Sequence, residues 1–441
     1  MWKYGRCKWG DNNRRLMEKG DSIWAPDERG MPREGELIPH LFRTEYRKIV
    51  SVLCTYFGFE GMEAAEDIAS ETFLTAMQTW GVRGIPANPT AWLYHVAKNK
   101  GLNQLQRNKT FERKVGPEWK KGFAGEGEAV WEIDLSPQHI IDSQLQMMFA
   151  VCHPSIPAEA QIGLSLRVLC GFGIGEIADA FLTNKETIHK RLSRAREKLR
   201  SEKIDIQMPV ASEIDGRLEP VLTTIYLLFN EGYYSGSGDT LLRKELCWEA
   251  MRLCTMLVES PLTNKPAVNA LLSLMCFHAS RFDARLDEKG GLILYDEQDS
   301  SRWNPDLISK GGYFLRCSMS GSALSRYHLE AGIAAWSTRQ EDSPEKWEQV
   351  LDLYNKLLMV AHSPVAALNR TYVLSKVRGK AAAIREAEKL QLVDTHFYYA
   401  LLGELYTGVD EEKARGYWKR ALELARTEAE RGAIRKRLAD S

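Results

Sequence analysis

The sequence predicts an all-α protein, and three observations carry that prediction. Apolar residues recur at spacings of three and four over most of the 441 residues, almost no segment alternates with period two, and Gly and Pro clusters separate the periodic segments. The chain is long enough for several domains of roughly 100 to 200 residues each. Its 44% hydrophobic content supports well-buried cores. We therefore expect a multidomain protein built from helices.

Several functional classes are excluded at this stage. No apolar run approaches the roughly 20 residues that a membrane helix needs, and the N-terminus lacks the apolar core of a signal peptide. We expect a cytoplasmic protein with no membrane partner. The eight cysteines form no CxxC pair and no zinc-site spacing with histidine, which favours reduced, mostly buried thiols. No nucleophile, metal set or cofactor loop is evident, so we expect no enzyme activity, no cofactor and no metal.

Gly, Pro and charge clusters divide the chain into six predicted segments. They are an N-terminal tail (1–34), a helical segment (35–112), a flexible linker (113–139), a second helical segment (140–203), a helical accessory domain (206–320) and helical repeats (321–441). The formal net charge is zero, yet Glu60–Glu71 carries five acids, and Lys98–Lys114 carries six bases and one acid. Charge is therefore segregated by segment.

The stretch "TNKETIHKRLSRAREKLR" (Thr183–Arg200) predicts a basic amphipathic helix. Its apolar residues form one narrow stripe, Ile188, Leu192, Ala195 and Leu199, at spacings of four, three and four. Upstream, "GFGIGEIADAFLTNKET" supplies a short helix and a turn that ends in Thr183 and Asn184, which are good capping residues. A basic helix alone is more often a solvated or partner-facing surface. The preceding helix and turn favour a helix-turn-helix whose second helix enters the major groove.

Two further segments separate the classes of DNA-binding protein. "AEDIASETFLTAMQTW" (Ala65–Trp80) predicts an acidic amphipathic helix, and "PTAWLYHVAKNKGLNQLQRNK" (Pro89–Lys109) predicts a helix with aromatics at one end and polar or basic residues at the other. A repressor that only binds DNA does not need this pair of helices. Both segments resemble region 2 of bacterial sigma factors of the extracytoplasmic-function class. The first segment shows this in its pattern of Asp67, Glu71 and Phe73, and the second in its pattern of Trp92, Leu93 and Asn99.

The helix-turn-helix resembles region 4.2 of the same class, including the "RAREKLR" ending. The resemblance implies that 35–112 is sigma region 2 and that 140–203 is sigma region 4. It implies core RNA polymerase as a partner, through the β′ clamp helices and the β flap, and promoter DNA as the second partner. Such a protein does not itself catalyse, because it gives the core enzyme its promoter.

The resemblance also assigns site residues. Polymerase binding falls on Asp67 and Glu71. The resemblance assigns contacts with the minus 10 element to the loop residues Arg83 and Asn88. It assigns further contacts with this element to the polar side of the next helix, to Asn99, Asn103, Gln104 and Arg107. Trp92 is more simply interpreted as a core residue. Contacts to the minus 35 element fall on His189, Lys190, Ser193 and Arg194 for base edges or nearby phosphates, and on Lys185, Thr187, Arg191 and Arg196 for the backbone.

The C-terminal half predicts a regulatory helical extension. Leu368, Tyr372 and Ala387 recur 34 residues later as Leu402, Tyr406 and Ala421, and 34 residues is the tetratricopeptide period. An irregular helical bundle is the alternative. "LLFNEGYYSGSG" (Leu227–Gly238) and "RKELCWEAMRLC" (Arg243–Cys254) resemble the sigma-factor subgroup with a tetratricopeptide-like extension. The glycines of the first stretch lack a GK[ST] ending, which favours a helix-joining loop capped by Asp239 over a phosphate loop.

Alternatives remain open at this point. The main one is a helix-turn-helix regulator that binds DNA without polymerase and senses a ligand through its helical half. Another is a repeat scaffold whose basic helix binds an acidic protein. The sequence leaves open whether the extension activates or inhibits and whether it takes a protein or a small molecule. It also leaves open the promoter, the signal, and whether translation starts at Met1 or Met31.

Overall fold

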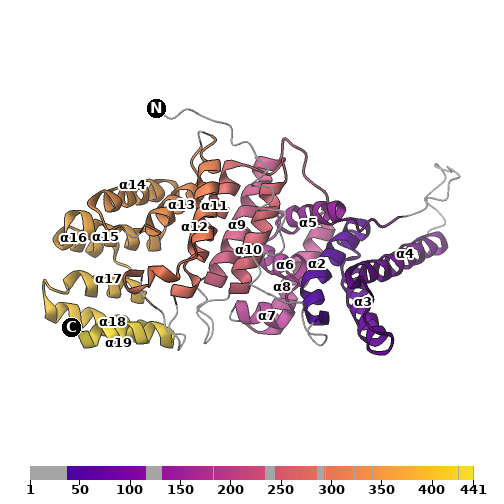
Figure 1. The fold of residues 1–441 in the computed structure, drawn as a ribbon, viewed down its shortest axis with the longest axis horizontal. Coiled ribbons are helices and arrows are strands. Elements are labelled where there is room, and N and C mark those ends of the chain that lie inside the picture. The colour runs from indigo at the N-terminus through magenta and orange to yellow at the C-terminus, as the bar shows by residue number, and fades with distance from the viewer. Residues whose placement is uncertain are drawn as a thin grey trace. The chain divides into compact units, whose positions relative to one another are not determined.

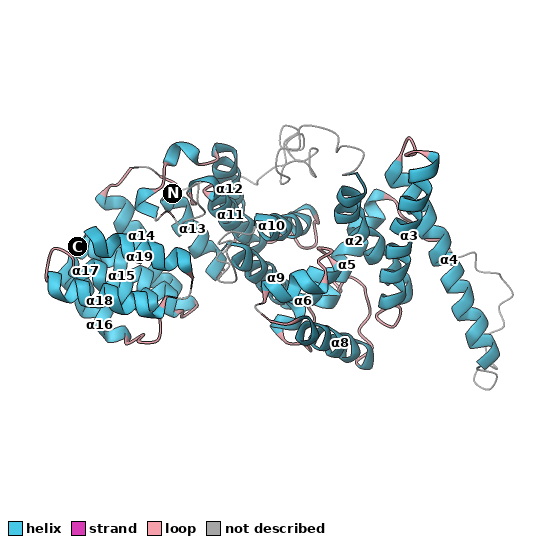
Figure 2. Ribbon diagram, turned by 90° about the horizontal axis from the view of Figure 1, so that it is seen from below, coloured by secondary structure: helices cyan, strands magenta, loops and turns pink. Residues whose placement is uncertain are grey.

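In the computed structural model the described residues are 37–115, 132–181, 183–233, 244–285, 293, 295–321, 323–339, 341–425 and 427–440. Within these ranges the secondary structure consists of α-helices and short 3-10 helices, with no strand, as predicted (Figures 1 and 2). The predicted tail 1–34, with Met31, and the loop expected to be capped by Asp239 lie outside the described residues.

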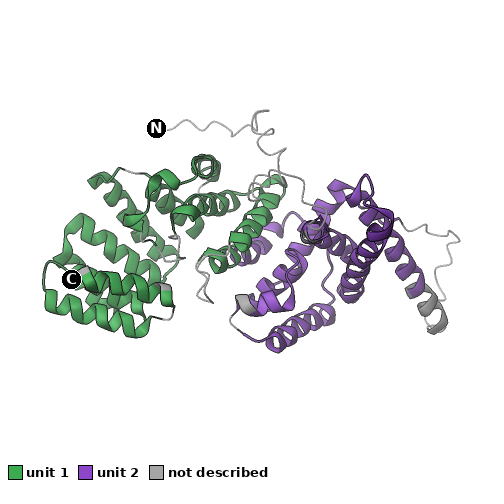
Figure 3. Ribbon diagram, turned by 60° about the horizontal axis from the view of Figure 1, so that its bottom comes forward, with its two compact units in different colours: residues 1–24, 225–441 green, residues 25–224 purple. Residues whose placement is uncertain are grey.

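Two compact units divide the chain between Thr224 and Ile225, a point that lies inside one helix, α9 (Ile214–Tyr233) (Figure 3). The unit of residues 25–224, purple in Figure 3 and called the first unit below, also holds the helices α2 (Leu37–Phe57), α3 (Met62–Arg83), α4 (Pro89–Val115), α5 (Pro137–Val151), α6 (Ala158–Val168), α7 (Ile174–Ala180) and α8 (Lys185–Ser201). The unit drawn in green is called the second unit. The predicted boundary between the second helical segment and the accessory domain, at 203–206, precedes this division and lies on the N-terminal side of α9.

Helices α2, α3 and α4 pack against one another around an apolar core. Ile49, Leu53 and Met62 are fully buried there, together with Leu93 near the start of α4. The helix α3 shows the spacing that this burial requires, because its buried residues recur every three or four positions from Met62 to Trp80. The acidic residues of α3 occupy the positions between them.

Helices α5, α6, α7 and α8 form the second part of this unit. Helix α6 packs on α5, α7 and α8, and α2 packs on both α5 and α6. Helix α5 starts at Ser136, whose hydroxyl accepts a hydrogen bond from the backbone N–H of His139, with Pro137 at the first helical position. The two segments that the sequence analysis separates by a linker are therefore in direct contact.

Part of the predicted linker 113–139 is packed against the first helices. Ile133 is fully buried, and an added Cβ at Gly101 would lie 2.7 Å from the Ile133 Cδ1 atom and 2.8 Å from the Leu53 side chain. The absence of a side chain at Gly101 therefore leaves the space that Ile133 fills. Residues 116–131 of the linker lie outside the described residues.

The second unit, over its described residues from 225 onward, continues α9 and then runs through a chain of helices that pack mostly on their sequence neighbours. Its remaining helices are α10 (Lys244–Glu259), α11 (Pro266–Ala279), the 3-10 turns η1 (Phe282–Ala284), η2 (Tyr295–Glu297) and η3 (Ser300–Arg302), α12 (Pro305–Ser318), α13 (Arg326–Ser337), α14 (Pro344–Val360), α15 (Pro364–Arg378), α16 (Lys380–Leu390), α17 (His396–Tyr406), α18 (Glu411–Leu424) and α19 (Glu428–Asp440).

The 34-residue period coincides with a period of two helices. Leu368 and Tyr372 lie on α15 and Ala387 on α16, while Leu402, Tyr406 and Ala421 take the same places on α17 and α18. Five of the six are buried, and Tyr372 packs on the same core as Leu368 and Leu402. The period thus marks the contact between successive helix pairs. The tetratricopeptide assignment itself stays a prediction.

Candidate nucleic-acid interface

Helix α8 presents two opposite faces. The predicted stripe Ile188, Leu192, Ala195 and Leu199 is buried, each residue at 4% exposure or less. On the other side, His189, Lys190, Ser193 and Arg194 are all exposed. The helix starts at Asn184, whose side-chain oxygen accepts a 2.8 Å hydrogen bond from the Thr187 backbone N–H. The result is a fixed helix with a free polar and basic face.

The preceding elements hold α8 in place. Helix α7 packs on α8 and on α6, with Ile177 and Ala178 buried. In the turn between them the Thr183 N–H bonds to the Ala178 carbonyl at 2.9 Å, and the Arg191 guanidinium lies 5.5 Å from the centre of the Phe181 ring. Two packed helices joined by a tight turn are the arrangement that the predicted helix-turn-helix requires.

The predicted backbone contacts of α8 differ in accessibility. Lys185 and Thr187 are exposed, whereas Arg191 is partly buried beside Phe181. Lys190 makes an exposed ion pair with Glu186 at 2.7 Å, an interaction that a phosphate can replace at little cost. Arg196 points away from the exposed face, because its guanidinium bonds to Glu66 on α3 at 2.6 Å.

The outer face of α3 carries the predicted polymerase-binding acids. Asp67 and Glu71 are exposed, and Glu71 pairs with Lys100 of α4 at 2.8 Å. Leu74 and Met77 follow them at helical spacing and are 55% and 57% exposed. Sequence reasoning missed these two residues, although an apolar residue three positions after an exposed acid was the available signal. Acids beside exposed apolar side chains are typical of a protein-binding surface.

Arg83, predicted as a loop residue, is the last residue of α3, whereas Asn88 lies in the loop before α4, and both are exposed. The Asn88 side-chain oxygen accepts a 2.9 Å hydrogen bond from the Ala91 N–H at the start of α4. Asn88 therefore caps the helix, which leaves its amide nitrogen and the second lone pair of its oxygen for other contacts. The Trp92 ring packs 5.3 Å from the Trp80 ring in an edge-to-face arrangement, in line with its interpretation as a core residue.

Along α4 the other predicted minus 10 residues share the polar side. Asn99, Asn103 and Arg107 are exposed and Gln104 is partly buried. The Asn99 side-chain nitrogen lies 3.0 Å from the Nε2 atom of His95, one turn earlier. From residue 108 onward the side chains of α4 lie outside the described part of the chain.

A surface pocket lies where residues 132–135 cross α4. Its volume is about 480 Å³, and it is lined by Tyr94, His95, Lys98, Glu132, Ile133, Asp134 and Leu135. Lys98 pairs with Glu132 at 3.0 Å. Glu132 and Asp134 make this segment acidic, and hydrogen bonds from the Ser136 backbone N–H and hydroxyl lower the pKa of Asp134 further. Sequence reasoning had no signal for the pocket, because tertiary packing brings its two sides together.

The described part of the chain holds thiols but no cluster of metal ligands and no helix that could cross a membrane. Within them no group of three His, Cys, Asp or Glu side chains is arranged to hold a metal ion. The six described cysteines from Cys54 to Cys276 are buried, Cys317 is partly buried, and none of these seven forms a disulfide. None of the described helices combines the length and the hydropathy that crossing a membrane requires.

Comparisons with known proteins give two family matches. A model described as sigma-70 region 2 matches residues 41–111, which correspond to α2, α3 and most of α4. A model described as a family of unknown function, DUF6596, matches residues 217–319, from α9 to the end of α12. The chain is also similar to the uncharacterized protein R00370 of Rhizobium meliloti strain 1021. The two are 32% identical over 385 residues, which cover 86% of this chain and 90% of the relative. No solved structure matches the chain.

Proposed function

The chain belongs to the same family as the Rhizobium meliloti protein R00370 and carries a sigma-70 region 2 domain, and from this premise we propose that it directs RNA polymerase to its promoters. A sigma-70 region 2 domain suggests an RNA polymerase sigma factor that binds core polymerase and promoter DNA. In this proposal α3 binds the polymerase, α4 and the loop before it contact the minus 10 element, and α8 contacts the minus 35 element. The chain itself catalyses nothing.

One observation carries the proposal: the region 2 match covers helices that are followed, in the same compact unit, by a packed helix pair with an exposed basic face. A region 2 domain that bound only one promoter element would not need this second helix pair. A promoter with two separated elements needs a second DNA-binding helix, which α8 would supply. On α8, Arg194 and Lys190 stand opposite the buried stripe, where base edges and phosphates can reach them. The helix-turn-helix and the extracytoplasmic-function class are parts of this proposal.

The finer proposal concerns the remaining half of the chain. We propose that residues from 206 onward form a helical extension that the two promoter-contacting domains require for activity. Support comes from its size and from helix pairs that pack on their neighbours, an arrangement that usually offers an extended binding surface. A short connection to α8 keeps the extension at high effective concentration beside it. In a promoter reporter assay, a fragment ending near residue 203 should lose most activity at matched protein level, and so should one ending near residue 320.

A footprinting experiment with and without core polymerase tests the main proposal. Chromatin immunoprecipitation of the protein first identifies the DNA that it occupies in cells. Mapping of transcript starts in that DNA then identifies its promoter. The account predicts that purified protein protects this promoter only when core polymerase is added. Specific protection without polymerase would favour a helix-turn-helix regulator, and no specific protection in either case would favour a repeat scaffold.

A further inference from the structure

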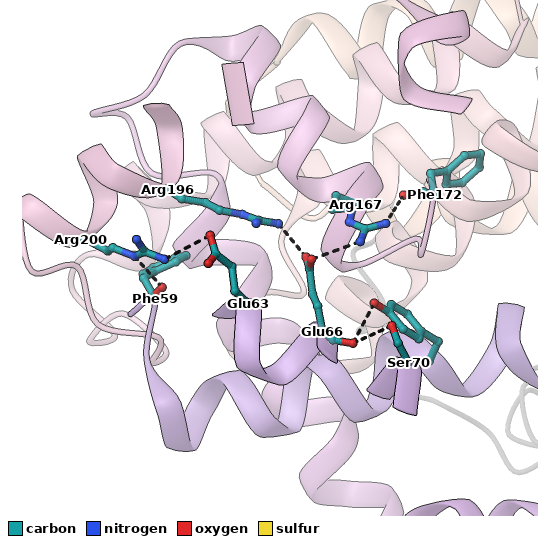
Figure 4. Close-up of polar contacts among 9 residues, drawn as sticks. Phe59, Glu63, Glu66, Ser70, Arg167, Phe172, Arg196 and Arg200 are labelled. Carbon is teal, nitrogen blue, oxygen red and sulfur yellow. Dashed lines mark hydrogen bonds and ion pairs between the residues drawn. The ribbon is translucent and has the colours of Figure 1, made fainter. Parts of the chain in front are cut away.

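A single carboxylate on α3 joins three helices. The Glu66 Oε1 atom lies 2.6 Å from Arg196 Nη2 on α8, and its Oε2 atom lies 3.2 Å from Arg167 Nη2 on α6 (Figure 4). The three side chains are 13%, 12% and 22% exposed, so this contact is largely removed from water. Glu66 is thus turned away from the surface that carries Asp67 and Glu71.

A second contact holds α8 to the same part of the chain. The Arg200 Nε atom donates a 3.0 Å hydrogen bond to the Phe59 carbonyl just before α3, and its Nη2 atom lies 3.8 Å from Glu63 (Figure 4). Both Arg196 and Arg200 leave the same edge of α8, one turn apart. The edge of the basic helix nearest α3 is therefore occupied by the protein's own acids and carbonyl.

This arrangement brings the two predicted DNA-binding faces close together. Lys100, beside Asn99 on α4, bonds to Glu71, and Glu71 lies five residues, or about 7.5 Å of helix rise, from Glu66. Promoter elements centred near minus 10 and minus 35 are roughly 25 base pairs, or about 85 Å, apart at 3.4 Å per base pair. While Glu66 joins α8 to α3 and α2 stays packed on α5 and α6, the two faces cannot both contact such a promoter.

We propose that Glu66 locks α8 against α3 in a closed form of the free protein, and that promoter binding requires Arg196 to exchange Glu66 for a DNA phosphate. The inference rests on the proposed function, since only a protein that contacts two distant DNA elements must separate these helices. Carboxylate and phosphate are equivalent partners for a guanidinium, and both accept its paired N–H groups. The exchange therefore leaves Arg196 paired in either form.

The test is a distance measurement on the full chain with the variant Glu66→Gln. Spin labels go on cysteines introduced at Val82 and Glu159, both exposed, in a background where Cys7 and Cys317 are replaced by serine and the buried cysteines remain. Removing one partner of a buried ion pair leaves the other charges uncompensated, so the ratio of separated to close label pairs should rise by roughly tenfold or more. The matched control Glu60→Gln, an exposed acid just before α3, should match the unsubstituted protein.

A DNA-binding measurement accompanies the distances. Without polymerase, Glu66→Gln should bind a duplex carrying the mapped promoter about tenfold more tightly than the unsubstituted protein, while Glu60→Gln, which removes the same charge, changes affinity less than about twofold. Equal tightening by both variants would mean that only overall charge matters, and would overturn the lock.

The outcomes separate the lock from the proposed function. Label distances in Glu66→Gln that equal those of the unsubstituted protein would overturn the lock. If Glu66→Gln does not fold, Arg196→Gln removes the α8 side of the contact and must show the same opening in the label distances. Promoter-specific transcription by the unsubstituted protein, measured in parallel with core polymerase, tests the proposed function alone, because it does not depend on whether the variants open.

Discussion

Two kinds of contact hold helices together in this chain, and each compact unit supplies an example of one kind. In the first unit, Glu66 on α3 pairs with Arg196 on α8 and with Arg167 on α6. In the second, helices meet where small residues let side chains approach closely: an added Cβ would lie 2.7 Å from the Trp418 ring at Gly403 and 2.8 Å from the Phe277 ring at Gly311. An ionic contact can change partners without leaving a cavity, whereas a close-packed contact cannot open without losing its packing. The first type suits a joint that opens, and the second suits a fixed surface.

The largest expected effect comes from the exposed acids on the other side of α3. Reversing charge at Asp67 and Glu71 together should weaken core polymerase binding on the order of a hundredfold at low salt, because like charges facing each other across an interface cost several kcal/mol. Co-purification and titration with core polymerase measure the change. Label distances across the Glu66 contact should not change, which separates the outer face of α3 from its inner one.

Glu60→Lys is the control for this prediction, since it reverses an exposed charge near the start of α3. Polymerase binding that survives the double reversal at Asp67 and Glu71 would remove these residues from the polymerase interface.

Arg194→Ala tests whether the exposed face of α8 contacts DNA, in contrast to the edge of α8 that Arg196 and Arg200 hold against α3. Each good base contact contributes about 1 to 3 kcal/mol, so promoter affinity of the polymerase complex should fall by roughly tenfold or more, and core binding should stay unchanged. Lys198→Ala, which removes an exposed base that pairs with Glu202 just after the same helix, serves as control. Unchanged promoter occupancy in Arg194→Ala would mean that this face of α8 does not contact DNA.

A pair of glycines tests the close-packed contacts of the second unit. Gly403→Ala places a methyl group against the Trp418 ring and should destabilise this unit by about 1 to 3 kcal/mol. Gly416→Ala, one helix later, meets nothing within 4 Å and should stabilise it by about 0.5 to 1 kcal/mol. Thermal unfolding of both variants measures the difference. A stabilising Gly403→Ala would contradict the comparison.

The smallest effect concerns pH and the second unit. Burial first, and then the charges of Arg281 and Arg285, hold the pKa of His278 well below its ordinary value of 6.5. The folded unit keeps His278 neutral while the unfolded chain takes up a proton below about pH 6.5, so stability present above this pH is lost as pH falls. The slope from one such group is at most about 1.4 kcal/mol per pH unit.

His278→Leu should therefore flatten the fall in unfolding free energy between about pH 6.5 and 5. Some slope should remain, because burial also lowers the pKa of His328 in the same unit. An unaltered pH dependence in His278→Leu would show that this histidine does not titrate with unfolding.

The local structure followed from the sequence where periodicity decides burial. The stripe from Ile188 to Leu199, the capping by Asn184 and the all-helical fold are as predicted. Contacts between distant segments did not follow. An arginine beside an apolar stripe, such as Arg196, can turn toward solvent or toward another helix, and nothing in the sequence relates it to Glu66, 130 positions away.

The same reason applies to the linker and to function. Ile133 stands in a charged, glycine-rich stretch that predicts flexibility, and only the space above Gly101 explains its burial. The sigma-70 region 2 prediction agrees with an independent family match, because its motifs lie within one short segment. The roles of single side chains on α4 and α8 stay predictions, because the sequence of a promoter cannot be derived from the identities of the residues that contact it.

The most direct test of the central claim is run-off transcription with purified core polymerase on a template that carries the mapped promoter. The account predicts transcripts that start at the position mapped in cells, appear only when this protein is added, and disappear when the minus 35 or minus 10 element is scrambled. Equal transcription with core polymerase alone, or none with both components present, would contradict it.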